Sequence, residues 1–412
     1  MGEQVLAQYG RVTIYTEDNH PSPIYHVDGS AEPNPYGDLA VLLEDDALEE
    51  VMYNGGTQCV KIAHRDHGMC RTNIWIDDDS GIQIAKNIAA FTNVPLGDGP
   101  GLVPIFDGRL PDGSRVNGTI PPVTPDGPTL TIRKFREDPL TMIDLVKFGT
   151  VNSRLAAMMW VWIEGLDSRP ANFVIAGGTG SGKTTTLNCL GMYIPWHRRL
   201  LTVEDTAELQ VYHDHWLRME TRRERPDGTP EVDMNDCLKS SLRMRPDRII
   251  VGEVRGPEAA TLLTAMNTGH DGSFGSLHAN TAQETVTRMI NPPMLVPPIM
   301  LSGLDLIIIQ ARLHVNGKTA RKITEVAEIA GMEGDKPRLN IIWKYNAATD
   351  QIEETGIPSK LREVICTAAG VSPDVFEKHV SQRQAIIEDL VRRDIHNIQT
   401  VTQVIQNFYA SR

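Results

Sequence analysis

The stretch Gly177-Gly178-Thr179-Gly180-Ser181-Gly182-Lys183-Thr184 decides the fold of this chain. It matches the pattern G-x-x-x-x-G-K-[ST] in full, and its glycines let successive backbone N–H groups converge on phosphate oxygens. We expect an apolar strand before it, over residues 172–176, and a helix after it, over residues 183–194. A strand and a helix on either side are the context in which such a loop binds a nucleoside triphosphate.

Two side chains of the loop are expected to contact the phosphates and the metal ion. Lys183 is expected to neutralise the β- and γ-phosphates, and the Thr184 hydroxyl is expected to hold Mg²⁺, which prefers oxygen ligands. The expected nucleotide-binding residues are Gly177, Gly178, Thr179, Gly180, Ser181, Gly182, Lys183, Thr184 and Thr185. The sequence therefore predicts that the chain binds ATP together with Mg²⁺.

Two apolar strands downstream of the loop end in carboxylates. Residues 200–205 read Leu-Leu-Thr-Val-Glu-Asp, and residues 248–253 read Arg-Ile-Ile-Val-Gly-Glu. The carboxyl ends of parallel strands line the ligand crevice, so Glu204, Asp205 and Glu253 are expected near the γ-phosphate. His270 and His278 flank a glycine-rich segment that we expect at the same edge of the sheet.

Short apolar strands alternate with helices through the centre of the chain, which predicts an α/β fold with a mostly parallel sheet and helices on both faces. We expect an acidic leader and a small α+β domain over residues 1–136, a linker over 137–150, the α/β core over 151–350 and a helical segment over 351–412. The first fifty residues, rich in Pro, Gly and Asp, are expected to form a loosely packed leader with a strand or two.

Composition excludes several classes of protein. Residues 1–130 hold 19 Asp or Glu against 7 Lys or Arg, which argues against a broad nucleic-acid-binding surface. The five cysteines are far apart and form no C-x-x-C pair, which indicates a reducing, cytosolic compartment. No signal peptide is evident at the N-terminus, and no apolar run approaches the ~18 residues of a membrane-spanning helix. Any role at a membrane is therefore expected to depend on a partner.

Four blocks of residues stand in the order of a known family: 177–186, 202–206, 242–256 and 268–280. Together they resemble the Walker A, Asp box, Walker B and His box of the type II/type IV secretion ATPases, the motors of pilus assembly, protein secretion and the archaellum. The run Ile-Arg-Lys-Phe-Arg-Glu-Asp-Pro-Leu-Thr, which begins at Ile132, looks most like the archaeal branch and its tight-adherence-pilus relatives. The resemblance implies a RecA-like P-loop NTPase core.

The resemblance also implies a homohexameric ring with ATP bound between the two domains. By that resemblance, Glu204 is the general base for the attacking water and Glu253 positions Mg²⁺ with Thr184, although the two carboxylates could exchange roles. Catalytic positions implied or suggested on this basis are Lys183, Glu204, Glu253, His278, Arg133, Arg136, Arg243, Arg245 and Arg255. The implied partner is a polytopic membrane platform protein, and the implied location is the cytoplasmic face of the cell membrane.

Two other functions remain open at this point. A RecA-like motor of DNA transfer would share the same loop, and a scaffold could bind ATP with negligible turnover. The acidic front half counts against the first, and the intact Lys183, Glu204 and Glu253 count against the second. Which filament or cargo is moved, and whether the motor extends or retracts it, also stays open.

Overall fold

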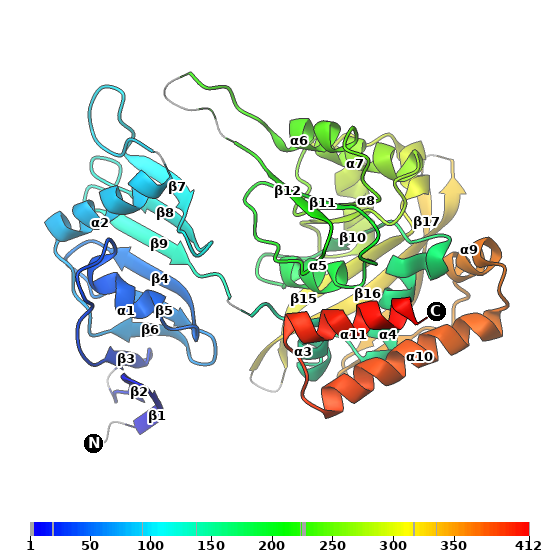
Figure 1. The fold of residues 1–412 in the computed structure, drawn as a ribbon, viewed down its shortest axis with the longest axis horizontal. Coiled ribbons are helices and arrows are strands. Elements are labelled where there is room, and N and C mark those ends of the chain that lie inside the picture. Colours follow the sequence, from blue (N-terminus) through cyan, green and yellow to red (C-terminus); the bar gives the residue numbers. More distant parts are fainter. Residues whose placement is uncertain are drawn as a thin grey trace. The chain divides into compact units, whose positions relative to one another are not determined.

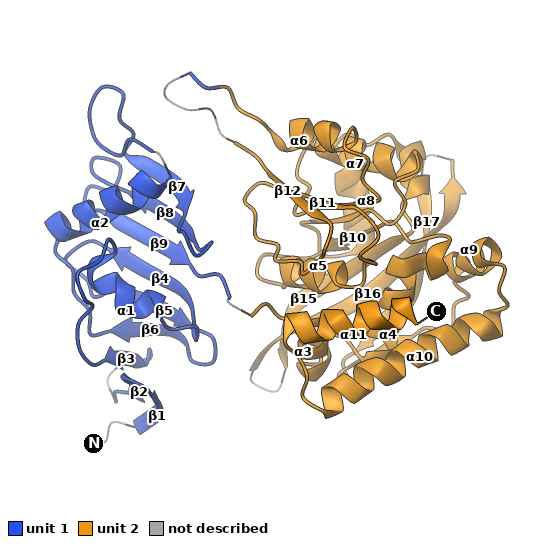
Figure 2. Cartoon of the chain, viewed as in Figure 1, with its two compact units in different colours: residues 1–137, 225–229 blue, residues 138–224, 230–412 orange. Residues whose placement is uncertain are grey.

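The computed structural model describes residues 4–18, 20–92, 94–136, 138–222, 224, 228–315, 318–334 and 336–411. The chain forms two compact units, coloured separately in Figure 2. Unit 1 comprises residues 1–137 with 225–229, and unit 2 comprises residues 138–224 with 230–412. Among the described residues, no helix combines the length and the apolarity needed to cross a bilayer.

Unit 1 is built on a nine-stranded sheet in the order β1-β2-β3-β6-β5-β4-β9-β8-β7. The strands are β1 (Gln4–Tyr9), β2 (Val12–Thr16), β3 (Ile24–Val27), β4 (Leu48–Asn54), β5 (Lys61–His64), β6 (Gly68–Thr72), β7 (Ile105–Arg109), β8 (Arg115–Thr119) and β9 (Thr129–Arg133). The helical elements are η1 (Gly37–Leu39), α1 (Ala40–Leu43) and α2 (Asp78–Phe91). In β9, buried Leu130 and Ile132 alternate with outward residues, the pattern of a sheet covered on one face.

The expectation of a loosely packed leader is wrong for β2 and β3. Val12 and Ile14 alternate along β2, so both side chains point to the covered face, where they are buried with Tyr25 and Val27 of β3. These strands join the main sheet because β3 pairs in parallel with β6. The apolar segments are short and are surrounded by acidic and turn-forming residues, so the sequence alone did not indicate that they belong to the core.

Unit 2 contains a second nine-stranded sheet, in the order β12-β11-β13-β14-β10-β15-β16-β17-β18. The strands are β10 (Phe173–Ala176), β11 (Leu200–Glu204), β12 (Trp216–Glu220), β13 (Arg248–Val251), β14 (Phe274–Leu277), β15 (Leu306–Val315), β16 (Lys318–Glu333), β17 (Lys336–Asn346) and β18 (Gln351–Glu354). The pairs from β12 to β15 are parallel, and those from β15 to β18 are antiparallel. The prediction of an α/β fold is confirmed.

Helices cover both faces of this sheet (Figure 1). Phe173 and Ile175 of β10 pack into one apolar cluster, and Val174 and Ala176 pack into the other. Helices of the first cluster are α3 (Met142–Lys147), α4 (Ser153–Glu164), α5 (Lys183–Gly191), α9 (Lys360–Ala369), α10 (Pro373–Arg392) and α11 (Ile398–Ala410). Helices of the second are α6 (Met234–Ser241), α7 (Glu258–Asn267) and α8 (Ala282–Ile290). Short 3-10 turns lie at η2 (Gly165–Asp167) and η3 (Pro298–Gly303).

Two segments differ from the expected boundaries. Helix α3 begins within the range expected to be a linker, and its Met142, Ile143 and Leu145 are buried in the core of unit 2. Strand β18 lies within the range expected to be helical and pairs with β17. Beyond it the segment is helical, and the Ser372 side chain accepts a hydrogen bond from the Val375 N–H at the start of α10.

Candidate nucleotide-binding and catalytic site

The phosphate-binding loop joins the end of β10 to the start of α5. A Cβ on Gly177 would lie 2.1 Å from the Gln310 carbonyl oxygen, so only glycine fits there. Gly180 and Gly182 have φ angles of +71° and +94°, a left-handed conformation that side chains disfavour. The close packing and backbone conformation explain why the loop needs glycine at these positions.

Lys183 lies inside the loop at the start of α5. Its Nζ donates hydrogen bonds to the carbonyl oxygens of Gly177 at 2.9 Å and Gly178 at 3.1 Å. Burial lowers the pKa of Lys183, the charge of Arg255 lowers it further, and Glu253 acts in the opposite direction. The ammonium group is therefore held at the mouth of the loop, where an anion would relieve its desolvation.

The residues around Lys183 fit a bound phosphate group. Ser181 is buried, and its Oγ has no hydrogen-bond partner among the described residues. Half-buried Thr184 and Thr185 stand in the first turn of α5, where backbone N–H groups lack partners within the helix. A buried hydroxyl and free amides at one helix start suit phosphate oxygens, and the Thr184 hydroxyl would be available to Mg²⁺.

Glu204 ends β11 with its side chain inside the protein, at 2% exposure. Its Oε2 accepts hydrogen bonds from the backbone N–H groups of Glu208 at 2.6 Å and Leu209 at 2.8 Å, whereas its Oε1 is buried with no partner in the described structure. Burial raises the pKa of Glu204, although the two backbone bonds oppose that shift. The Glu204 Cγ lies 3.0 Å from where a Cβ on Gly252 would stand, so Gly252 makes room for it.

Glu253 follows β13 and has the opposite electrostatic character. Its two oxygens accept hydrogen bonds from Nε and Nη2 of Arg255, both at 2.8 Å, and its Oε1 lies 3.0 Å from Nε2 of His278. Burial alone would raise the pKa of Glu253, but the Arg255 hydrogen bonds and charge lower it overall. Glu253 is therefore a fixed, ionised carboxylate, the kind of group that orients a hard cation.

His278 and Arg255 complete the group around Glu253. His278 comes directly after β14, and burial together with the charge of Lys183 lowers its pKa, so the imidazole is neutral near pH 7. Arg255 also lies 3.7 Å from Asp205, which follows β11. The carboxyl ends of β11, β13 and β14 thus bring Glu204, Asp205, Glu253, Arg255 and His278 to the edge that bears the loop, as expected for parallel strands.

One residue that the sequence reasoning missed positions Arg255. The buried Glu258 carboxylate, at the start of α7, accepts hydrogen bonds from the backbone N–H groups of Arg255 at 2.6 Å and Gly256 at 2.8 Å. An acidic residue at the beginning of a helix after Gly-Pro is a signal that could have identified it. Gln310, which has no sequence motif, was also missed; it accepts a hydrogen bond from Thr186 Oγ1 at 2.8 Å.

Several expected site residues lie elsewhere. Arg243 and Arg245 are exposed and precede β13, so they stand at the amino edge of the parallel strands rather than at the loop. Arg133, at the end of β9, and Arg136 belong to unit 1. Their expected roles stay predictions.

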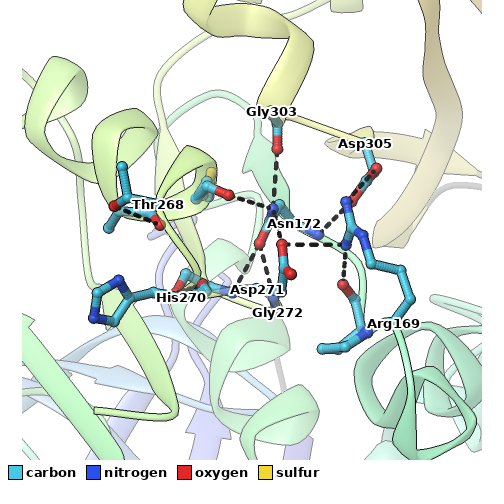
Figure 3. A network of polar contacts seen from close by, with 12 residues as sticks. Arg169, Asn172, Thr268, His270, Asp271, Gly272, Gly303 and Asp305 are labelled. Carbon is cyan, nitrogen blue, oxygen red and sulfur yellow. Dashed lines mark hydrogen bonds and ion pairs between the residues drawn. The ribbon is translucent and has the colours of Figure 1, made fainter. Parts of the chain in front are cut away.

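The expectation for His270 is wrong. His270 precedes β14, and the residues that follow it contact Asn172, which precedes β10, so this segment is at the amino edge (Figure 3). The Asn172 side chain accepts hydrogen bonds from the N–H groups of Gly272 at 2.7 Å and Ser273 at 3.2 Å, and it donates to the Gly303 carbonyl at 3.0 Å. The network ties strands together at the edge away from the phosphate loop.

Comparison with known proteins shows the family of this chain. An uncharacterised protein of Methanocaldococcus jannaschii is 32% identical, over 90% of this chain and 75% of its own length. The conjugal transfer protein TrbB of Rhizobium radiobacter is 33% identical, over 71% of this chain and 87% of its own length. The crystal structure of the Yersinia pseudotuberculosis ATPase DotB has the same fold, with a TM-score of 0.52 at 14% identity over 92% of this chain and 96% of that one. Residues 100–402 match the type II/IV secretion system protein family, to which this chain belongs.

Proposed function

We propose that this chain is an ATP-hydrolysing motor of a type II/IV secretion or pilus machine. The observation that carries the proposal is the contrast between two carboxylates at neighbouring strand ends beside the phosphate loop. Glu204 is buried with one oxygen unpaired and a raised pKa, whereas Glu253 is ionised and held by Arg255 and His278. Two acids whose environments separate their pKa values are typical of a site that divides base and charge-holding roles.

We assign the general base to Glu204. A raised pKa and an unpaired Oε1 favour acceptance of a proton from the water that attacks the γ-phosphate. Backbone bonds to its other oxygen hold the side chain in one orientation. The base is therefore positioned before substrate arrives.

We assign the metal site to Thr184 and Glu253. Mg²⁺ bound there would neutralise charge on the β- and γ-phosphates. Arg255 fixes the Glu253 carboxylate through two parallel hydrogen bonds, and Nε2 of His278 lies 3.0 Å from Oε1 of Glu253. Lys183 supplies the positive charge inside the loop.

The family membership supports the wider assignment to a hexameric motor that acts through a membrane platform partner at the cytoplasmic face of the membrane. Pilin-like subunits are the proposed cargo. Arg243 and Arg245 stand at the amino edge of the strands, so their proposed action on a nucleotide requires the site of a neighbouring copy. Arg133 and Arg136 are proposed to contribute charge from unit 1.

The test is ATP turnover by the full chain and by Lys183→Ala, Glu204→Gln and Glu253→Gln. Each variant is expected to lose about 10²-fold or more in kcat, since each removes a group that positions, deprotonates or neutralises the reacting atoms. Glu363→Gln changes an exposed acid of α9 and serves as the control. Parental turnover by Lys183→Ala or by both carboxylate variants would refute the proposed function.

A second candidate is a motor of DNA transfer. The observation in its favour is that the Rhizobium radiobacter relative is named a conjugal transfer protein. The acidic composition of residues 1–130 counts against direct contact with DNA and therefore against this candidate. Stimulation of ATP turnover by DNA, falling steeply with added salt, would favour this candidate over the first.

A further inference from the structure

Two arginines stand beside the phosphate loop on the flank opposite the carboxylates. In the sheet, β14 and β13 follow β10 on one side and β15 and β16 follow it on the other. Arg321 of β16 donates a hydrogen bond from Nε to the Gly180 carbonyl at 3.1 Å. Nη1 of Arg312, on β15, lies 3.7 Å from where a Cβ on Gly180 would stand. The loop therefore has the carboxylates and Arg255 on one flank and Arg312 and Arg321 on the other.

Arg312 and Arg321 are direct cross-strand partners in the antiparallel pair of β15 and β16. Directly opposite residues point to the same face, and like charges in that position destabilise the strand pair. Neither guanidinium has an ion-pair partner within the described part of the chain, and both residues are exposed. The pair is electrostatically unfavourable by itself, so an anion between or beside the two groups would stabilise it.

The hairpin packs directly against the loop. A Cβ on Gly182 would lie 3.0 Å from Gln310 Nε2 and 3.2 Å from Arg321 Cδ. Gln310 also accepts the hydrogen bond from Thr186, one turn into α5. Arg321 is thus held against the part of the loop that leads into the helix, and Arg312 lies opposite it on β15.

We propose that Arg312 and Arg321 form a guanidinium clamp for the diphosphate group that ATP and ADP share. The inference rests on the proposed function, because it takes the loop as a nucleotide site with the γ-phosphate directed to Glu204 and Glu253. The opposite flank then faces the rest of the nucleotide. Guanidinium groups suit phosphate oxygens through paired, charge-assisted hydrogen bonds.

The clamp acts on binding and leaves the chemical step to the carboxylates. Arg312→Gln is expected to weaken ADP binding about tenfold, the size of one hydrogen bond to a charged group, and to raise the KM for ATP by a similar factor. The kcat at saturating ATP should stay within about twofold of the parent, because the lost contact is equal in ground and transition states. Without nucleotide, the melting temperature should be unchanged or higher, since one of two like charges is gone.

The experiment is titration calorimetry with ADP, thermal unfolding with and without ADP, and steady-state ATP turnover, all on the full chain. The variants are Arg312→Gln, Arg321→Gln and Arg321→Lys, the last of which keeps the charge and should recover part of the ADP affinity. Arg338→Gln, on β17, is the matched control. Arg338 pairs with Gly331 of β16, which is ten residues from Arg321, or about 33 Å along the strand, so this arginine is far from the loop.

The clamp is supported when both glutamine variants bind ADP more weakly with kcat unchanged, and when the nucleotide-free melting temperature of Arg312→Gln does not fall. It is overturned when both bind ADP as tightly as the parent, or when kcat falls at unchanged KM. Lys183→Ala separates this result from the proposed function. If the parent binds ADP and Lys183→Ala does not, parental affinity in the arginine variants removes only the clamp. If the parent itself binds no nucleotide, both proposals fail.

Discussion

Replacing Glu204 by Gln should lower activity while raising stability at alkaline pH. The carboxylate is almost fully buried, and one oxygen has no partner in the described structure. Glutamine keeps an oxygen to accept the hydrogen bonds from Glu208 and Leu209, and it removes the charge. Its own amide is left buried, which offsets part of the gain, so we expect a net increase of about 1 kcal/mol in the free energy of unfolding.

The pH dependence follows from the direction of the pKa shift. Because folding raises the pKa of Glu204, the ionised carboxylate opposes folding, and that cost grows as pH rises from the ordinary pKa of the group through its folded value. The gain in Glu204→Gln should therefore be full near pH 8 and small near pH 4. For a unit of this size, about 1 kcal/mol corresponds to a melting temperature roughly 2–4 °C higher.

Glu253→Gln provides the opposite case. The pKa of Glu253 is lowered in the folded protein, so its ionised form contributes stability above the ordinary pKa, and that contribution is lost as pH falls. This variant should be less stable than the parent near pH 8 and similar near pH 4. Both variants should lose kcat. Thermal unfolding across this pH range and ATP turnover are the assays, and a Glu204→Gln protein that is less stable than the parent at pH 8 would refute the reasoning.

Two further predictions concern stability away from the nucleotide. Asn172→Ala leaves the N–H groups of Gly272 and Ser273 without their acceptor, so the free energy of unfolding measured in urea should fall by about 2–4 kcal/mol. The KM for ATP should be unchanged, because this network lies at the edge of the sheet away from the phosphate loop. A raised KM would show that the two edges are coupled. Arg383→Leu removes the guanidinium partner of the buried Glu164 carboxylate and should lower the free energy of unfolding by about 3–5 kcal/mol, whereas adding Glu164→Leu should recover most of that loss. Equal unfolding free energies for the single and double variants would contradict this reading of the buried pair.

The parts of the site that could be predicted from sequence are those whose pattern is local. The glycines of the loop, Lys183 and the carboxylates after β11 and β13 are each defined by a strand and the residues that directly follow it. The parallel arrangement then brings them together, because every such residue lies at the carboxyl edge. The same rule, applied to residues that precede a strand, would have placed Arg243, Arg245 and His270 at the amino edge.

Other contributors could not be predicted because they come from elements without a motif. Gln310 and Arg321 reach the loop from β15 and β16, and their role depends on which strand is the neighbour of β10. Strand order in a sheet is a property of the whole fold, which no local pattern specifies. The burial of β2 and β3 was not predicted for a similar reason, since β3 joins the main sheet through β6, which lies far along the chain.

The different behaviour of Glu204 and Glu253 is the least predictable feature, because both are glutamates at the carboxyl end of an apolar strand. Glu204 is the last residue of β11, and Glu253 lies two residues beyond the end of β13. Glu253 has Arg255 two residues later, on the same side of an extended segment, so its partner is visible in the sequence. Glu204 turns inward because Gly252, on the neighbouring strand end, offers space and because the Glu208 and Leu209 N–H groups meet it. A side chain at position 252 would push this carboxylate toward water and remove the cause of its raised pKa, so the proposed assignment of the base depends on the glycine that follows the neighbouring strand β13.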